Sequence, residues 1–207
     1  MAPFAEGSFD YIPAPVRAFY SVLAYDVTWL NAKWRIYRQL FDSGDDVLQL
    51  LNTTGPSFFR VLQDALKADI FVSIARLLDP PQTKGRKNAS FDRLSEELTS
   101  AGYVEASQAL TTITAQMRLE CAQILKRRHR ILAHRDLPSA LRLDTEALRI
   151  IDPATIGEAI ALAGKALNSV EGSFEDRDTA FEGVSLHDDA RHILAILRQA
   201  QAQSHEQ

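Results

Sequence analysis

Residues 110–136 read LTTITAQMRLECAQILKRRHRILAHRD, and their apolar positions follow the period of an α-helix. One stripe recurs at intervals of three and four residues, at Leu110, Ile113, Met117, Cys121 and Ile124. The next two positions of this stripe are Arg128 and Leu132. An arginine therefore occupies a place that favours an apolar residue, and burying its charge is costly unless it has a partner or faces a polar cavity. We expect Arg128 to pair with Asp79 as first candidate, or with Asp69 as second.

The same stretch ends in the densest basic segment of the chain. Residues 126–135 hold five of the 23 Lys and Arg residues and two of the five histidines. His134 follows Arg128 by six residues, which is about 120° around an ideal helix. The two side chains therefore do not share a narrow face of one regular helix. They converge only if the helix becomes irregular near Pro138, or if a second chain completes the cluster.

The bulk composition limits the class of protein. A chain of 207 residues with 46% hydrophobic residues can form one domain or two small ones around a sizeable core. The net charge of −4 argues against a protein that coats nucleic acid by bulk charge. Any RNA contact must come from a local patch, and we expect no DNA partner.

Several kinds of site are disfavoured by the sequence. The single cysteine, Cys121, excludes an intrachain disulfide and a zinc cluster of the multi-cysteine kind. His187 and His192 are five residues apart and do not stack on one helix face, so we expect no metal and no other cofactor. No apolar run is long enough for a membrane helix, and no basic region precedes an apolar segment at the N-terminus. We therefore expect a cytoplasmic protein without membrane contact.

The hydrophobic periods and caps predict an all-α fold, an up-and-down bundle of four to five main helices. Long helices are expected over 15–41, 56–78, 90–100, 104–135 and 153–170. A short helix is expected over 46–52, and a last one of about 16 residues should follow a capping box at Ser185 and Asp188. We divide the chain into a helical bundle, residues 14–170, and a segment 171–207. That segment is expected to be a linker with a C-terminal helix packing on the bundle or on a dimer partner.

The helix expected over 56–78 carries two polar stripes. Arg60, Gln63, Asp64 and Lys67 form an ordinary solvated face. A second stripe lies on nearly the opposite side, at Asp69, Ser73 and Arg76. Either this second stripe points into the protein, or the later half of the helix rotates into solvent.

Three short elements together resemble a known family. Arg128, the polar His129 and His134 fit the Arg-polar-x4-His form of the motif found in the HEPN superfamily of helical domains. Arg76-Leu77-Leu78-Asp79-Pro80 at the end of one helix, Asn88-Ala89-Ser90 at the start of the next, and Ala133-His134-Arg135-Asp136 are similar to the AbiU-type, abortive-infection branch. The resemblance covers roughly residues 20 to 170.

The resemblance implies a metal-independent endoribonuclease of a phage-defence or toxin-like system. Arg128 and His134 would be the catalytic residues, with the arginine gripping phosphate and the histidine transferring protons. The resemblance further implies that two protomers build the cleft as a homodimer and that the products carry 2′,3′-cyclic phosphate ends. Substrate contacts would come from Lys126, His129, Arg130 and Arg135, and supporting positions would be Asp69, Arg76, Asp79, Asn88 and Asp136.

Two other interpretations remain open from the sequence. In the first, the chain is a non-catalytic helical module of the same fold that binds RNA, a nucleotide or a protein partner. In the second, it is a purely structural helical dimer, with Arg128 in a core ion pair and His134 at a helix C-terminus. Some toxins of this superfamily carry a tyrosine two residues after the histidine that an antitoxin modifies. Asp136 occupies that position here, which argues against that form of control.

Overall fold

A computed structural model of the chain describes residues 4–5, 7–129, 150–184 and 186–205. The predicted all-α class is confirmed. The helices are α1 (Ala14–Phe41), α2 (Asp45–Thr54), α3 (Pro56–Leu77), α4 (Phe91–Ser100), α5 (Val104–Glu120), α6 (Ala122–Arg127), α8 (Pro153–Glu171) and α9 (Ala190–His205). A short 3₁₀ turn, η2 (Phe181–Gly183), lies between the last two.

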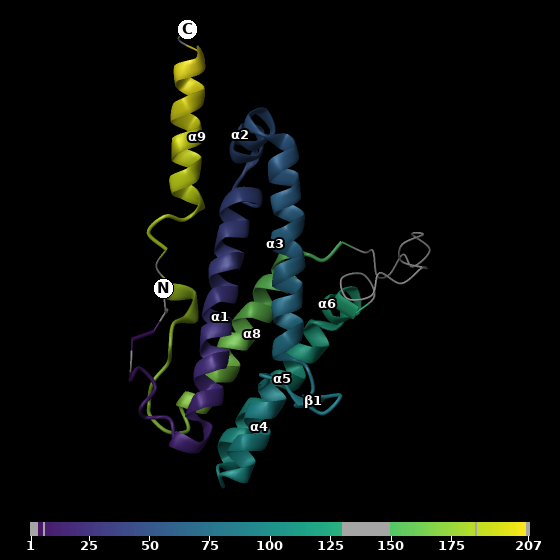
Figure 1. The fold of residues 1–207 in the computed structure, drawn as a ribbon, viewed down its shortest axis with the longest axis vertical. Helices are drawn as coiled ribbons and strands as arrows, with labels where there is room; N and C mark the ends of the chain where they lie inside the picture. Colours follow the sequence, from purple (N-terminus) through teal and green to yellow (C-terminus); the bar gives the residue numbers. More distant parts are fainter. Residues whose placement is uncertain (1–3, 6, 130–149, 185, 206–207) are drawn as a thin grey trace.

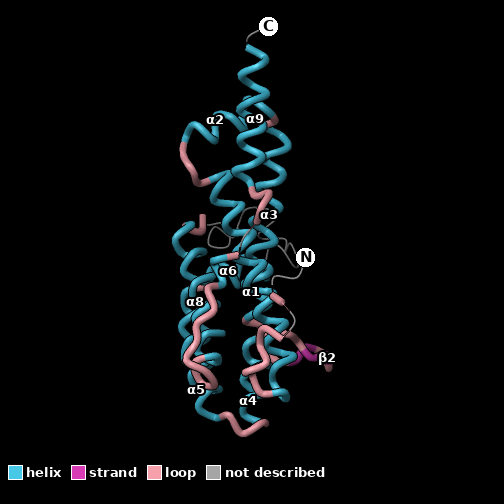
Figure 2. The backbone as a smooth tube through the Cα atoms, turned by 90° about the vertical axis from the view of Figure 1, so that its left-hand side faces the viewer, coloured by secondary structure: helices cyan, strands magenta, loops and turns pink. Residues whose placement is uncertain are grey.

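The bundle is elongated, with α1 and α3 along its length (Figure 1). In the lower half, α5 packs against α8 and α4, and α1 packs against α3, α8 and α4 (Figure 2). These helices share one core, whose fully buried members include Tyr20, Leu23, Ile74, Leu94, Leu110, Met117 and Leu167. The apolar stripe of the motif helix therefore faces this core.

Local sequence signals set the helix ends. The Ser90 hydroxyl accepts a hydrogen bond from the Arg93 N–H at 3.3 Å, and Asp152 accepts one from the Ala154 N–H at 2.8 Å. Both are N-cap bonds that satisfy an otherwise unpaired donor at the start of a helix. Pro153 occupies the first turn of α8, where its missing N–H costs nothing.

The helix expected over 104–135 is broken at Cys121, and the prediction of one continuous helix is wrong. Cys121 has a ψ of 4°, far from the α-helical value of about −42°. Met117, Cys121 and Ile124 all remain fully buried across this break. The last described residues of this segment, Arg128 and His129, adopt a wider π-helical turn, a geometry often found at functional sites.

A small hairpin follows α3, where the sequence indicated only a loop. Strands β1 (Gln82–Thr83) and β2 (Arg86–Lys87) pair antiparallel, with Gln82 opposite Lys87. The turn residues Lys84 and Gly85 have φ values of 48° and 80°. Positive φ at both central residues suits a two-residue hairpin turn, and glycine adopts it without a steric penalty.

The C-terminal helix α9 packs beside the ends of α1 and α2 through a second, smaller apolar cluster (Figure 1). Its members are Leu40, Val47, Leu50, Leu51, Phe59, Ala190 and Leu194. The cap of α9 is Asp189 rather than the predicted Ser185 and Asp188 pair, because its carboxylate accepts the Arg191 N–H at 3.0 Å. Ser185 lies outside the described residues. Along the described chain, no helix has the length and apolar character needed to cross a bilayer.

Candidate functional site

The candidate site begins at the C-terminal end of α6, which packs against α3. Nη2 of Arg128 lies 3.6 Å from Oδ2 of Asp79, and the two side chains are 32% and 28% exposed. The prediction that Asp79 partners Arg128 is confirmed. The ion pair is long and partly hydrated, so it fixes the arginine without using all of its five N–H donors.

The segment that carries Asp79 is itself held in place. The Asn88 side-chain amide donates to the Pro80 carbonyl at 2.7 Å and contacts the Thr83 hydroxyl at 2.8 Å. Arg118 of α5 forms an ion pair with Asp92 of α4 at 2.7 Å and reaches the Leu78 carbonyl at 3.4 Å. Asn88 therefore supports the hairpin beside Asp79. The sequence did not predict the Arg118–Asp92 pair, because neither residue occupies a position in an apolar stripe, as Arg128 does.

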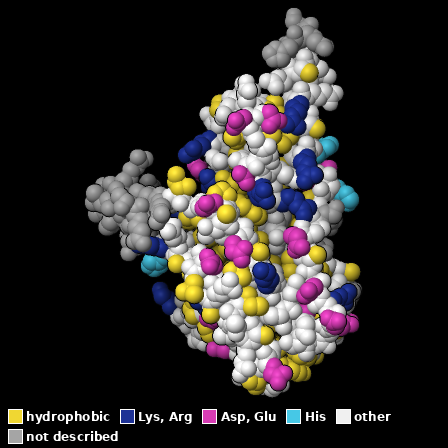
Figure 3. Space-filling model, turned by 180° about the vertical axis from the view of Figure 1, so that it is seen from behind, with side chains coloured by type: hydrophobic (Ala, Val, Ile, Leu, Met, Phe, Trp, Pro, Cys, Tyr) yellow, Lys and Arg dark blue, Asp and Glu magenta, His cyan; other side chains and the backbone are white. Residues whose placement is uncertain are grey.

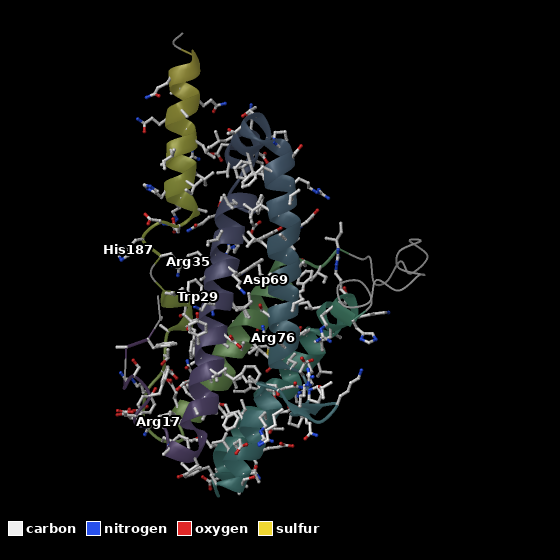
Figure 4. All side chains as sticks on the ribbon, in the orientation of Figure 1. Arg17, Trp29, Arg35, Asp69, Arg76 and His187 are labelled. Carbon is white, nitrogen blue, oxygen red and sulfur yellow. The ribbon has the colours of Figure 1, made fainter. Side chains whose placement is uncertain are left out.

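Asp69 and Arg76 face α1 rather than Arg128 (Figure 4). Lys33 of α1 lies 2.6 Å from Oδ2 of Asp69 and donates to the Ser73 hydroxyl at 3.3 Å. Asp69 is therefore not the partner of Arg128. A cavity of about 250 Å³ lies at this contact, lined by Tyr25, Asp26, Trp29, Lys33, Ser73 and Arg76. The second polar stripe of α3 thus turns toward a neighbouring helix.

The remaining predicted site residues lie at and beyond the end of α6. Arg127, which the sequence did not single out, lies among them, and its guanidinium carbon is 5.8 Å from the centre of the Phe71 ring, a cation–π contact between α6 and α3. Beside it, Lys126 is half-buried and His129 is exposed. The predicted residues Arg130, His134, Arg135 and Asp136 lie outside the described residues. The arrangement of His134 relative to Arg128 therefore stays a prediction.

Burial makes the one thiol unreactive. Cys121 is fully buried, and loss of hydration raises the pKa of its thiol to about 12, with the Glu120 carboxylate adding to the effect. A thiolate nucleophile at this position is therefore disfavoured near neutral pH. Across the described part of the chain, no three His, Cys, Asp or Glu side chains converge to hold a metal ion. His187 lies before α9, on the other side of the molecule from α6 (Figure 4).

A larger cavity, about 680 Å³, lies between α1 and α9 and is rich in arginine. Lys and Arg side chains gather over this upper region in the rear view (Figure 3). Most of these arginines have structural partners. Arg38 pairs with Asp42, Arg198 pairs with Asp46 at 3.0 Å, and Arg35 donates to the backbone carbonyls of residues 182 and 184. The Arg198–Asp46 pair attaches α9 to α2, and the Arg35 bonds attach the linker to α1, so this cavity is a weaker candidate for substrate binding.

The comparison with known families identifies the fold. The HEPN family model described as AbiU2 matches residues 14–193, which includes the whole bundle, the linker and the start of α9. No curated protein and no solved structure shows significant similarity to the chain.

Proposed function

The chain belongs to the AbiU2 family of HEPN domains, which is related to abortive infection, and from this premise we propose that it is a metal-independent endoribonuclease. It would act in phage defence or in a toxin-like response. The observation that carries the proposal is the Arg128–Asp79 pair at the end of α6. A guanidinium is held there at the protein surface, with donors left over for a phosphate group.

In the proposed reaction, Arg128 binds the scissile phosphate and stabilises the charge that develops at phosphorus. His134 takes the proton of the ribose 2′-hydroxyl or supplies one to the leaving oxygen, because an imidazole serves both roles near neutral pH. The 2′-oxygen attacks phosphorus and the bond to the 5′-oxygen breaks. The products are a 2′,3′-cyclic phosphate and a 5′-hydroxyl, so atoms balance without an added reactant.

The proposed substrate is single-stranded or loop RNA, whose backbone is accessible. The phosphates around the cut would be contacted by Lys126, His129, Arg130 and Arg135.

We propose a homodimer in which the 126–136 segments of the two chains face one another. Arg128 and His134 diverge around one regular helix, and a second chain can bring an arginine and a histidine together. We propose a cytoplasmic location, because the proposed substrate is cellular RNA.

The test is cleavage of total RNA by the purified protein in EDTA. Wild-type protein should cut and leave cyclic phosphate and 5′-hydroxyl ends. His134→Ala should lower the rate about 100- to 10,000-fold, the usual contribution of a positioned acid or base. His187→Ala is the matched control, because His187 is an exposed histidine far from α6. Arg128→Lys should also lose much activity, since an ammonium does not reproduce the planar fork.

A non-catalytic binding module is the second candidate, and the net charge of −4 favours it. In that case a folded protein would bind RNA, a nucleotide or a protein partner without cutting. Activity that requires Mg²⁺, or activity that survives His134→Ala, would contradict the proposed ribonuclease. RNA binding without any cleavage would support the binding module.

A further inference from the structure

A groove runs beside α6 on the face of α3 that the sequence marked as ordinary solvated surface. It encloses about 500 Å³ and lies between α3, the end of α6 and the start of α8. Its lining includes Arg60, Asp64 and Lys67 of α3, Arg127 of α6, and Ile150 and Pro153 at the start of the α8 segment. The volume is in the range of natural ligand sites, which is about 300–1,000 Å³.

The groove has the opposite charge from the chain as a whole. Arg60, Lys67 and Arg127 supply three positive charges, and Asp64 supplies one negative charge. Its balance is therefore positive, in a protein whose net charge is −4. The Arg60–Asp64 pair is exposed and spans 3.3 Å, so water weakens it. A polyanion entering the groove would meet a local positive potential.

Two of these cations are held on aromatic rings. The Lys67 ammonium lies 5.5 Å from the centre of the Tyr37 ring, and the Arg127 guanidinium lies 5.8 Å from that of Phe71. A ring attracts a cation through its quadrupole and uses none of its N–H donors. The Lys67 head is therefore positioned by a contact that does not occupy its N–H donors.

The opposite wall of the groove is apolar. Ile150 is 88% exposed, and it leads through Ile151 and Pro153 into α8. A cationic wall beside an exposed apolar wall suits a chain that carries both phosphates and flat bases. The neighbouring residue Arg128 lies at the end of the same helix as Arg127.

We infer that this groove binds the backbone of single-stranded RNA next to the cutting site. Arg60 and Lys67 contact successive phosphates, the charge of Arg127 adds to the positive potential of the groove, and Ile150 packs against a base. The inference rests on RNA being the substrate in the proposed function. It adds a binding site on α3 that lies outside the Arg–His motif and determines how the strand is held.

The test is RNA binding by protein carrying His134→Ala, so that cleavage does not interfere. Fluorescence anisotropy of a labelled single-stranded RNA is followed over a series of salt concentrations. The logarithm of the RNA association constant falls as the logarithm of the salt concentration rises. The double variant Arg60→Gln with Lys67→Gln should make this slope less steep by about 1.4, because each phosphate contact on a single strand contributes about 0.7. If parent and variant bind equally at about 1 M salt, this difference in slope makes the variant bind RNA roughly 10- to 100-fold more weakly than its parent at about 50 mM salt.

Matched variants distinguish the effect of the groove residues on RNA binding from the effect of surface charge elsewhere on the protein. Lys165→Gln with Arg191→Gln removes two exposed charges that do not line the groove, and it should bind like the parent. Arg60→Lys with Lys67→Arg keeps both charges and should retain most of the affinity. Thermal unfolding of each variant checks that the fold is intact.

The outcomes distinguish this inference from the ribonuclease proposal. If a folded groove variant binds RNA with the same affinity and salt slope as the matched control, the groove inference is wrong, even if wild-type protein cuts RNA. If binding depends on the groove but wild-type protein never cuts, the inference holds and the ribonuclease proposal fails. Absence of any RNA binding overturns the inference.

Discussion

A buried carboxylate at the end of α8 is predicted to hold the N- and C-terminal parts of the chain together. Glu171 is fully buried. It accepts hydrogen bonds from the Tyr11 hydroxyl at 2.7 Å, the Tyr20 hydroxyl at 2.5 Å, and both the N–H and the hydroxyl of Thr179, at 3.0 and 2.8 Å. These partners come from the segment before α1, from α1 and from the linker after α8. One side chain thus joins three segments.

Replacing Glu171 with leucine should destabilise the fold by about 1–3 kcal/mol. The Tyr20 hydroxyl is fully buried and loses its acceptor away from bulk water, whereas the Thr179 N–H keeps the Asn168 side-chain oxygen as an acceptor at 3.2 Å. A stranded buried donor costs about 1–3 kcal/mol. The more exposed Tyr11 can turn to water. Part of the loss is offset, because the leucine no longer requires a charge to be buried.

The assay is urea unfolding followed by circular dichroism. With a slope of about 2–3 kcal/mol per molar urea, the midpoint should fall by roughly 0.5–1 M. Glu158→Leu is the control, because Glu158 is an exposed glutamate on the same helix. If Glu171→Leu and Glu158→Leu unfold at the same urea concentration, Glu171 does not have this structural role.

The same cluster predicts sensitivity to alkali. Burial is the main cause that raises the pKa values of Tyr11 and Tyr20 above the ordinary value of 10.0, and the hydrogen bond to Glu171 adds to it. Below pH 10 both the folded and the unfolded protein keep these two protons, so the tyrosine hydroxyls contribute fully to the free energy of unfolding. Above pH 10 the unfolded chain loses them first, and stability falls by up to about 1.4 kcal/mol per pH unit for each tyrosine. Tyr20→Phe should remove the part of this loss of stability that comes from Tyr20. The measurement is the unfolding midpoint at pH values from 9 to 11, roughly one unit on either side of the ordinary tyrosine pKa.

Three further predictions concern other parts of the molecule. The Cys121 thiol, with its pKa raised to about 12, should not react with a disulfide reagent at pH 8 until the protein unfolds, and rapid labelling of native protein would contradict its burial. The pKa of Asp189 is lowered, first by its hydrogen bond from Gln39, so the contribution of this α9 cap is present above about pH 4 and is lost as pH falls through the lowered value. Asp189→Ala should cost about 1 kcal/mol and speed hydrogen exchange in α9, and unchanged exchange would refute it. Sedimentation at tens of micromolar should show a dimer whose interface contains residues 126–136, whereas a monomer would oppose the two-chain cleft.

The helices were predictable because local signals determine where they begin and which face they bury. Ser90 and Asp152 are capping residues by type, and both make the expected bonds. The Arg128–Asp79 pair was predictable for a related reason. A charge within an apolar stripe requires a partner, and the end of the preceding buried helix supplies one.

Other features depend on contacts between distant residues and leave no local mark. Glu171 looked like part of an acidic linker, and its partners Tyr11 and Tyr20 precede it by 160 and 151 residues. The groove on α3 was missed because Arg60 and Lys67 form the same solvated pattern whether or not another helix adjoins them. The break between α5 and α6 at Cys121 has no proline or glycine that would mark it in the sequence.

Glu171 and Arg128 differ in what remains available to a ligand. Glu171 accepts four hydrogen bonds and is closed to solvent, so its bonding capacity is used within the fold. Within the described residues, Arg128 has a 3.6 Å pair to Asp79 and stays about a third exposed. A guanidinium offers five donors in a plane, which exceeds what one long carboxylate contact can use. Glu171 is therefore expected to contribute to stability, and Arg128 to binding phosphate.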